Sequence, residues 1–259
     1  MSVALTNLDR VLWPDAGFTK GDLVDYYRRI APVLLPHLRG RPLTLWRFPS
    51  GVHERGWWQN ECRGAPEWMR TAELRGQRFC VAEDEASLVW LANQGTVELH
   101  PFPFRLDGPE RPLALLLDLD PGPPAGLEAA RDVALLLRER VPGARVKTSG
   151  RGGLHLLAPP PPTFAAAKAR ARELAEELAA ARPDLVVAVQ SRAARRGRVL
   201  VDWLQNDPTR TTVAPYSLRG ARRPAVSTPV TWDEVERGEL AFEAADVLAR
   251  VERLGDLLG

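Results

Sequence analysis

The sequence is poor in cysteine and has no long apolar runs. Its 259 residues include two cysteines, Cys62 and Cys80, whose spacing matches neither a zinc motif nor a disulfide framework. We therefore expect both to be reduced thiols of a cytoplasmic protein. No apolar run approaches the roughly 20 residues that span a bilayer, and the opening segment, MSVALTNLDRVLWP, lacks the pattern of a secretory signal. These absences argue against a zinc-stabilised, secreted or membrane-bound protein.

Net charge is also low, at +2, so overall charge does not identify a nucleic-acid-binding protein. Arginines are clustered locally instead. The segment 192–198, RAARRGR, contains Arg192, Arg195 and Arg196 and no acid, and a second cluster follows at 219–223. Such clusters attract phosphate groups. A solvated, arginine-rich surface is the alternative interpretation.

The hydrophobic pattern predicts helices and strands that are interspersed without strict βαβ order. Helices are expected at 20–35, 85–94, 127–140 and 164–181 and from residue 232 onward, and strands at 43–48, 96–99, 113–119, 145–148, 154–158, 185–189 and 198–204. We expect an α+β fold with a central mixed or antiparallel sheet flanked by helices. The expected division is one domain, with an N-terminal α/β part at about 1–95, a core at about 96–230 and a helical tail at 231–259.

Three carboxylates are the most informative residues. The apolar run at 113–117 leads into Asp118-Leu119-Asp120, so the two acids project to the same side of a strand. Asp202 lies within a second apolar strand, where an unpaired charge is costly. Mutual repulsion favours a bound cation, and carboxylate oxygens suit Mg²⁺ or Mn²⁺. Three acids on neighbouring strands can hold two ions, as polymerases and two-metal nucleases both do.

A glycine-rich turn follows in the segment 147–155, KTSGRGGLH, between two predicted strands. Its glycines allow backbone N–H groups to approach an anion. Ser149 and His155 can donate hydrogen bonds to phosphate, and Lys147 opens the segment. No P-loop motif is present, and a structural hairpin is the alternative. His100 lies in V-E-L-H-P and is compatible with a structural role.

In several segments the chain resembles the polymerase domain of bacterial ATP-dependent DNA ligase D, within the archaeo-eukaryotic primase superfamily. The segments follow the family's order and cover nearly the whole chain: TNLDRVLWP…TKGDLVDYY (6–27), RPLTLWRFP (41–49), VELHPF (97–102), LLLDLDPG (115–122), KTSGRGGLHLLAP (147–159), GRVLVDWLQND (197–207), TTVAPYSLRG (211–220) and AVSTPVTWDEV (225–235). The resemblance implies a primase-polymerase type fold and a nucleotidyltransferase that extends a primer at a DNA gap or end during non-homologous end joining.

The resemblance also assigns residues to roles. Asp118, Asp120 and Asp202 match the family's metal-binding triad, which implies two Mn²⁺ or Mg²⁺ ions. Ser149, His155 and Arg219 match groups that contact the triphosphate of an incoming NTP or dNTP, and the motifs around His100 and Lys147 belong to the same nucleotide site. Asn7, Arg10 and Lys20 match a site for the 5′-phosphate of DNA, with Arg10 where lysine is usual.

The remaining expectations concern DNA and partner proteins. Trp57 or Trp58 can stack on a template base, although core positions are the alternative, and the arginines at 192–198 are expected to contact the DNA backbone. The family implies Ku and the ligase domain of ligase D, or a separate ligase, as partners, and a nucleoid-associated location. Asn60, Gly152 and Ala221 depart from the family's basic pattern. A de novo primase, a non-catalytic 5′-phosphate DNA-end-binding module and a two-metal nuclease remain alternatives.

Overall fold

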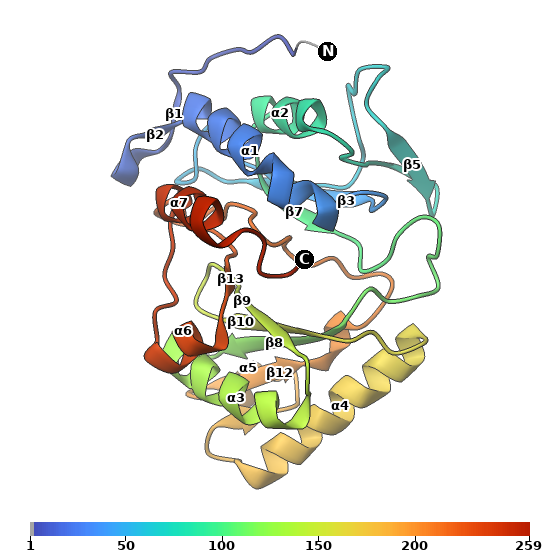
Figure 1. Ribbon diagram of the computed structural model, residues 1–259, viewed down its shortest axis with the longest axis vertical. Helices are drawn as coiled ribbons and strands as arrows, with labels where there is room; N and C mark the ends of the chain where they lie inside the picture. Colours follow the sequence, from blue (N-terminus) through green and yellow to red (C-terminus); the bar gives the residue numbers. More distant parts are fainter. Residues whose placement is uncertain (1–2) are drawn as a thin grey trace.

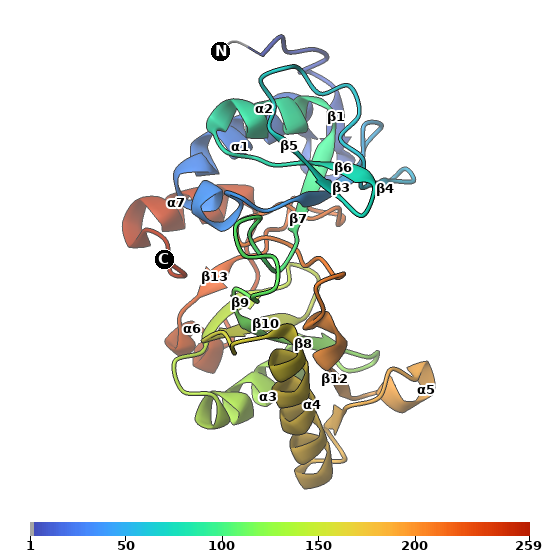
Figure 2. The ribbon, with the colours of Figure 1, turned by 90° about the vertical axis from the view of Figure 1, so that its right-hand side faces the viewer.

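The computed structural model describes residues 3–259, and its two larger sheets lie one above the other along the long axis (Figures 1 and 2). The five-stranded N-terminal sheet has the order β4-β3-β6-β5, with β7 paired to β3. The six-stranded central sheet has the order β11-β12-β8-β10-β9-β13 and contains both parallel and antiparallel pairs. The expected α+β class with a mixed central sheet is therefore confirmed.

The first part of the chain forms the N-terminal sheet, its helices and a two-stranded ribbon. These elements are β1 (Val11–Trp13), β2 (Phe18–Thr19), α1 (Lys20–Leu34), β3 (Leu43–Arg47), β4 (Trp57–Gln59), β5 (Thr71–Leu74), β6 (Gln77–Cys80), α2 (Glu85–Asn93) and β7 (Thr96–Pro101), with short 3₁₀ turns η1 (Pro14–Ala16) and η2 (Leu35–His37). Helix α1 begins at a capping box, in which Thr19 accepts from the backbone N–H of Asp22 and the Asp22 carboxylate accepts from that of Thr19.

The second part forms the central sheet and returns to the first. It comprises β8 (Leu115–Pro121), α3 (Leu127–Arg140), β9 (Arg145–Thr148), β10 (Leu154–Ala158), α4 (Phe164–Ala181), β11 (Val186–Val187), α5 (Arg192–Arg195), β12 (Val199–Asp202), η3 (Trp203–Gln205), β13 (Pro229–Val230), α6 (Trp232–Arg237) and α7 (Ala244–Leu254). Helix α7 lies against α1, so the end of the chain covers its beginning (Figure 1). Residues 3–259 contain no helix that combines the length and apolarity of a membrane span.

Helices α3 and α4 cover one face of the central sheet and determine which side chains face the other way. Leu115, Leu117 and Leu119 of β8 belong to one buried cluster with apolar residues of both helices. Because successive strand side chains alternate, Asp118 and Asp120 face the opposite side, toward the N-terminal sheet. The acidic side chains of β8 therefore lie on the face of the central sheet opposite α3 and α4.

The predicted elements agree closely around this sheet. Helices α3 and α4 and strands β9 and β10 have the expected bounds, whereas β8 lies two residues further along the chain than the range 113–119. Short strands such as β4, β5 and β6 were not predicted. The three-part division of a single domain stays a prediction; the apolar core of the N-terminal part also includes Tyr216 and Val247.

The expectation of reduced cysteines is wrong, because Cys62 and Cys80 form a disulfide with their Cα atoms 4.9 Å apart. Cys80 ends β6, and the backbone N–H of Cys62 donates to the carbonyl oxygen of Arg78 in the same strand. The loop after β4 is thus held against β6. A sequence separation of 18 residues does not reveal this pairing, because it depends on how the loop folds back.

A buried ion pair joins α7 to α6 and gives a test of this packing. Arg250 and Glu234 are 9% and 8% exposed, with Arg250 Nη2 3.0 Å from Glu234 Oε2. We expect Arg250→Met to lower the free energy of unfolding by about 3–5 kcal/mol, because Glu234 is left buried without its partner. The exposed Arg253 of the same helix supplies the control. Arg253→Met should change the free energy of unfolding by less than about 0.5 kcal/mol. Equal losses in urea denaturation contradict the prediction.

Candidate metal and phosphate site

The pairing of four strands puts the predicted site residues in one row across the central sheet. Asp202 of β12 is opposite Asp118 of β8, Asp118 is opposite His155 of β10, and His155 is opposite Lys147 of β9. Directly opposed residues of antiparallel strands point to the same face. The expectation that the acids occupy neighbouring strands on one side is confirmed.

The three carboxylates come close enough to share a cation. Asp118, Asp120 and Asp202 each offer an oxygen, and these oxygens lie within 4.8 Å of one another. Burial, followed by repulsion from Asp118, raises the pKa of Asp120 to about 6 and also raises the pKa of Asp202. The acids are therefore held against their mutual repulsion, and a bound cation relieves it.

Neighbouring groups orient two of the acids and leave the third with an unused oxygen. Asp202 Oδ1 accepts from Gln190 Nε2 at 2.8 Å and from the backbone N–H of Leu204 at 3.0 Å, while Arg195 Nη2 lies 3.5 Å from Asp120 Oδ2. The buried Asp118 Oδ1 lies 3.2 Å from His155 Nε2 but has no hydrogen-bond partner within residues 3–259. A free buried oxygen in an all-oxygen donor set fits Mg²⁺ or Mn²⁺.

The glycine-rich turn lies beside the acids because its backbone packs tightly on β8. Gly150 and Gly152 have φ values of +71° and +99°, and a Cβ on Gly153 would lie 2.4 Å from the carbonyl oxygen of Leu119. Ser149 Oγ accepts from the backbone N–H groups of Gly153, at 3.0 Å, and Arg151, at 3.2 Å. Its hydroxyl proton is thus left to donate to a ligand.

A carboxylate that the sequence analysis missed, Glu98 of β7, connects the N-terminal sheet to this turn. Glu98 is 0% exposed. Its Oε2 lies 2.9 Å from His100 Nε2 and 3.1 Å from Arg219 Nη1. Its Oε1 accepts from Arg151 Nη2 at 2.6 Å and from the backbone N–H of Gly220 at 2.9 Å. The signal was present, since an acid inside the apolar strand V-E-L-H is as costly as Asp202 in its own strand.

Burial controls the charge of the other predicted nucleotide-site residues. It lowers the pKa of His100 to about 4, so this imidazole is neutral at pH 7. Burial also lowers the pKa of Arg219 to about 10, which leaves the guanidinium charged. Burial and the charge of Arg219 lower the pKa of Lys147, whose Nζ donates to Ser227 Oγ at 2.6 Å. Arg219 Nε has no hydrogen-bond partner in the described part of the chain.

The residues predicted to bind a 5′-phosphate lie near the start of the chain. Asn7 adopts a φ of 53°, Arg10 Nη1 donates to Pro49 O at 2.9 Å, and the ammonium of Lys20 donates to Thr6 O at 2.5 Å. Burial and the charge of Arg10 lower the pKa of Lys20, so these two cations lie close enough to repel each other.

Two exposed tryptophans lie on β4, and Trp58 contacts His100, one of the residues predicted to bind the nucleotide. Trp57 and Trp58 are 47% and 50% exposed on β4, which excludes core positions for them. Trp58 stacks on Trp46 with ring centroids 4.6 Å apart and meets His100 edge-on at 4.7 Å.

The arginine segment forms a projecting arm around α5, which carries Arg192 and Arg195 and is followed by Arg196 (Figure 2). Its backbone contacts the end of β8, since Arg196 forms a β-bridge with Gly122 and a Cβ on Gly122 would lie 2.1 Å from Arg195 O. This contact places Arg195 beside the acidic triad, where its Nη2 lies 3.5 Å from Asp120 Oδ2.

A carboxylate cluster that can hold divalent cations, beside a turn whose groups can donate hydrogen bonds to phosphate, is typical of metal-dependent phosphoryl-transfer proteins. Comparison with known proteins identifies the family. The model of the LigD primase-polymerase domain matches residues 19–258. The chain belongs to this family, and the expected enzyme class, a nucleotidyltransferase, is confirmed with it.

Relatives and solved structures agree with the family assignment. The chain is 38% identical over 99% of its length to the multifunctional non-homologous end joining protein LigD of Mycolicibacterium smegmatis and 36% identical to the corresponding DNA repair protein of Mycobacterium tuberculosis. It spans 35% and 36% of these relatives, about a third of their length. The polymerase domain of Mycobacterium tuberculosis ligase D, solved in complex with DNA, superimposes with a TM-score of 0.92 at 36% identity, covering 99% of this chain and 96% of that one.

The raised pKa of Asp120 predicts how metal binding depends on pH. A cation must displace the proton that Asp120 holds below pH about 6. We expect Mn²⁺ affinity to be constant at high pH and to fall below pH 6, approaching about tenfold per pH unit as one proton is displaced. Electron paramagnetic resonance of free Mn²⁺ between pH 5 and 8 measures this. The control is Asp132→Asn, at an exposed acid on α3, which should show the same pH dependence as the wild type. A wild-type Mn²⁺ affinity that does not change between pH 5 and 8 contradicts the prediction.

Proposed function

We propose that this chain extends the 3′-hydroxyl end of a primer by template-directed nucleotidyl transfer at a DNA gap or broken end. The observation that carries the proposal is the convergence of Asp118, Asp120 and Asp202 within 4.8 Å, next to Ser149 and His155. Two Mn²⁺ or Mg²⁺ ions bound by the triad would supply activation of the hydroxyl and neutralisation of the leaving pyrophosphate.

Separate groups of residues would hold the metal ions and bind the triphosphate. Asp118, Asp120 and Asp202 would hold the cations, because Asp118 and Asp120 project together from β8 and Asp202 of β12 lies opposite Asp118. Ser149, His155 and Arg219 donate hydrogen bonds to the triphosphate. The primer oxygen attacks the α-phosphorus in line, a new P–O bond forms, and the bond to pyrophosphate breaks. The fixed donors stabilise the charge on the departing oxygens.

DNA is the proposed polymeric partner, and contacts to its backbone need no sequence preference. Asn7, Arg10 and Lys20 would receive the 5′-phosphate across the gap, while Arg192, Arg195 and Arg196 would follow the backbone. Half-exposed Trp57 and Trp58 offer ring faces for a template base. Support comes from the related polymerase domain of Mycobacterium tuberculosis ligase D, which was solved in complex with DNA.

The names of the curated relatives place them in non-homologous end joining. We extend that role to this chain, with Ku and the ligase domain of ligase D, or a separate ligase, as the proteins that recruit it and seal its product.

A gapped duplex carrying a 5′-phosphate, incubated with rNTPs or dNTPs and Mn²⁺, tests the proposed activity. We expect primer extension by the wild type and a loss of more than about a hundredfold in Asp118→Ala, because loss of an outer partner of a metal site alone costs up to about that factor. The exposed Asp132→Ala is the matched control. Shortening of the primer would identify a nuclease, synthesis on an unprimed template a primase, and equal extension by both variants would exclude the assigned metal site.

Glu98→Gln tests how the nucleotide site is built. Glutamine keeps the size but loses the charge that pairs with Arg219 and Arg151, so Glu98 is expected to act as a positioning residue. We expect KM for the NTP to rise about tenfold, which corresponds to about 1.4 kcal/mol, with a smaller change in kcat. Steady-state extension kinetics measure both values. Glu73→Gln, at an exposed acid of the same sheet, should leave KM unchanged; an equal KM in both variants contradicts this role.

A further inference from the structure

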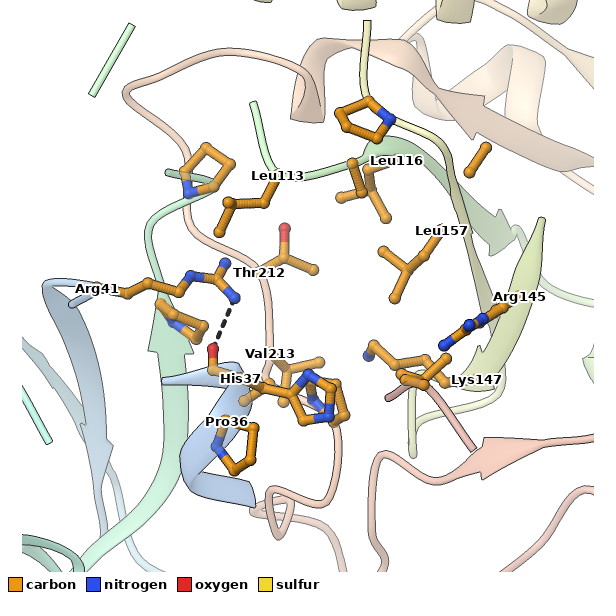
Figure 3. Close-up of a pocket in the computed structure, with 18 of the residues that line it drawn as sticks. Pro36, His37, Arg41, Leu113, Leu116, Arg145, Lys147, Leu157, Thr212 and Val213 are labelled. Atoms are coloured by element: carbon orange, nitrogen blue, oxygen red, sulfur yellow. Dashed lines mark hydrogen bonds between the residues drawn. The ribbon is translucent and has the colours of Figure 1, made fainter. Parts of the chain in front are cut away.

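A hollow opens between the two sheets, at the beginning of β8. It has a volume of about 480 Å³. Its walls come from both sheets and from η2, and Figure 3 shows the labelled side chains surrounding an open centre. Leu116 of β8 and Leu157 of β10 form part of its floor, on the same sheet face as Asp118 and His155.

Four basic side chains border this cavity, and no aspartate or glutamate is among its lining residues. The four are Arg41, Arg105, Arg145 and Lys147. Arg41, Arg105 and Lys147 donate to main-chain or hydroxyl oxygens: Arg41 to Phe102 O and His37 O, Arg105 to Pro36 O, and Lys147 to Ser227 Oγ. Arg145 donates to an oxygen of Gly259, the last residue of the sequence. None of the four forms an ion pair with an aspartate or glutamate between residues 3 and 259, whereas the remaining basic group, His37, pairs with Asp256.

Arg105 and Arg145 are exposed at the rim of the cavity, whereas Lys147 is buried and Arg41 is partly buried. Lys147 is 1% exposed. Burial and the nearby charge of Arg105 lower the pKa of Arg41 to about 9, so the two guanidinium groups act on one another across the wall. Converging cations without an acid carry a free-energy cost that a bound anion removes.

The rest of the wall is apolar and suits the body of a ligand. Leu113, which is 40% exposed, Leu116, Leu157 and Val213 face the open centre together with prolines (Figure 3). A cavity of this size, with apolar walls and a few convergent polar groups, is typical of small-molecule sites. Guanidinium groups match phosphate oxygens in geometry as well as charge.

The cavity shares only Lys147 with the metal and phosphate site. Its lining includes Lys147 but none of the triad acids, Ser149, His155 or Arg219. Lys147 lies in the row of Asp118 and His155, and the cavity extends from it in the direction of Leu116. We propose that this cavity is a second anion site that binds a polyphosphate, either pyrophosphate or the triphosphate of a nucleotide.

Isothermal titration of the whole chain in EDTA, without DNA, tests the site with sodium pyrophosphate, ATP and adenosine as probes. The double variant Arg105→Gln/Arg145→Gln should raise the Kd for pyrophosphate at least about tenfold, because it removes two charge-assisted contacts. The control Arg111→Gln/Arg170→Gln changes net charge equally at two exposed, ion-paired arginines and should keep the wild-type Kd. Leu157→Trp, which fills the cavity without changing charge, should weaken binding like the first variant.

The probes separate the two sources of phosphate. Tighter binding of ATP than of pyrophosphate identifies a nucleotide that also uses the apolar wall, and equal or weaker binding of ATP identifies pyrophosphate. The proposal is overturned if the wild type binds neither, if the cavity variants match the control, or if adenosine alone binds as well as ATP. Primer extension is not the readout, so failure of the polymerase function and failure of this site give distinct results.

Discussion

The register of β8 against β12 and β10 is the constraint on which the site depends. It aligns Asp202, Asp118, His155 and Lys147 in one row. A slip of one residue would turn Asp118 and Asp120 into the core under α3 and α4 and bring leucines to the opposite face of the sheet. That alternative is excluded by burial of Leu115, Leu117 and Leu119. The apolar face of β8 thus fixes the positions of the acids on its other face.

A carboxylate of the N-terminal sheet compensates the charges of two arginines at the site. Glu98 reaches from β7 to Arg219, Arg151 and the backbone of Gly220. Both carboxylate oxygens are used, and the residue is fully buried, so these cations are held at a fixed distance from the acids of β8. The grouping of Arg219 and Arg151 around Glu98 therefore depends on the packing of the two sheets against each other. Ser217 reinforces this closure, because its Oγ accepts from the backbone N–H of Leu99 at 3.0 Å.

Local patterns in the sequence predicted the part of the site that local geometry determines. Alternation placed Asp118 and Asp120 together, and the cost of a charge in an apolar strand identified Asp202. Local patterns could not predict contacts between segments that are distant in the sequence. The disulfide of Cys62 with Cys80, the role of Glu98 and the basic cavity all depend on how loops and sheets meet in space. The short strands β5 and β13, of four and two residues, were not recognised from the hydrophobic pattern.

Linkage between protons, metal and folding follows from the acid cluster. Burial and repulsion from Asp118 raise the pKa of Asp120 from its ordinary value of 3.8 to about 6, so the native state holds this proton more tightly than the unfolded chain. Its contribution to stability is greatest below pH 3.8 and is lost as pH rises through about 6. A divalent cation reverses this loss, because it binds the deprotonated native cluster and stabilises it by mass action. The repulsion that makes the empty site costly near neutral pH is thus the source of its affinity for metal.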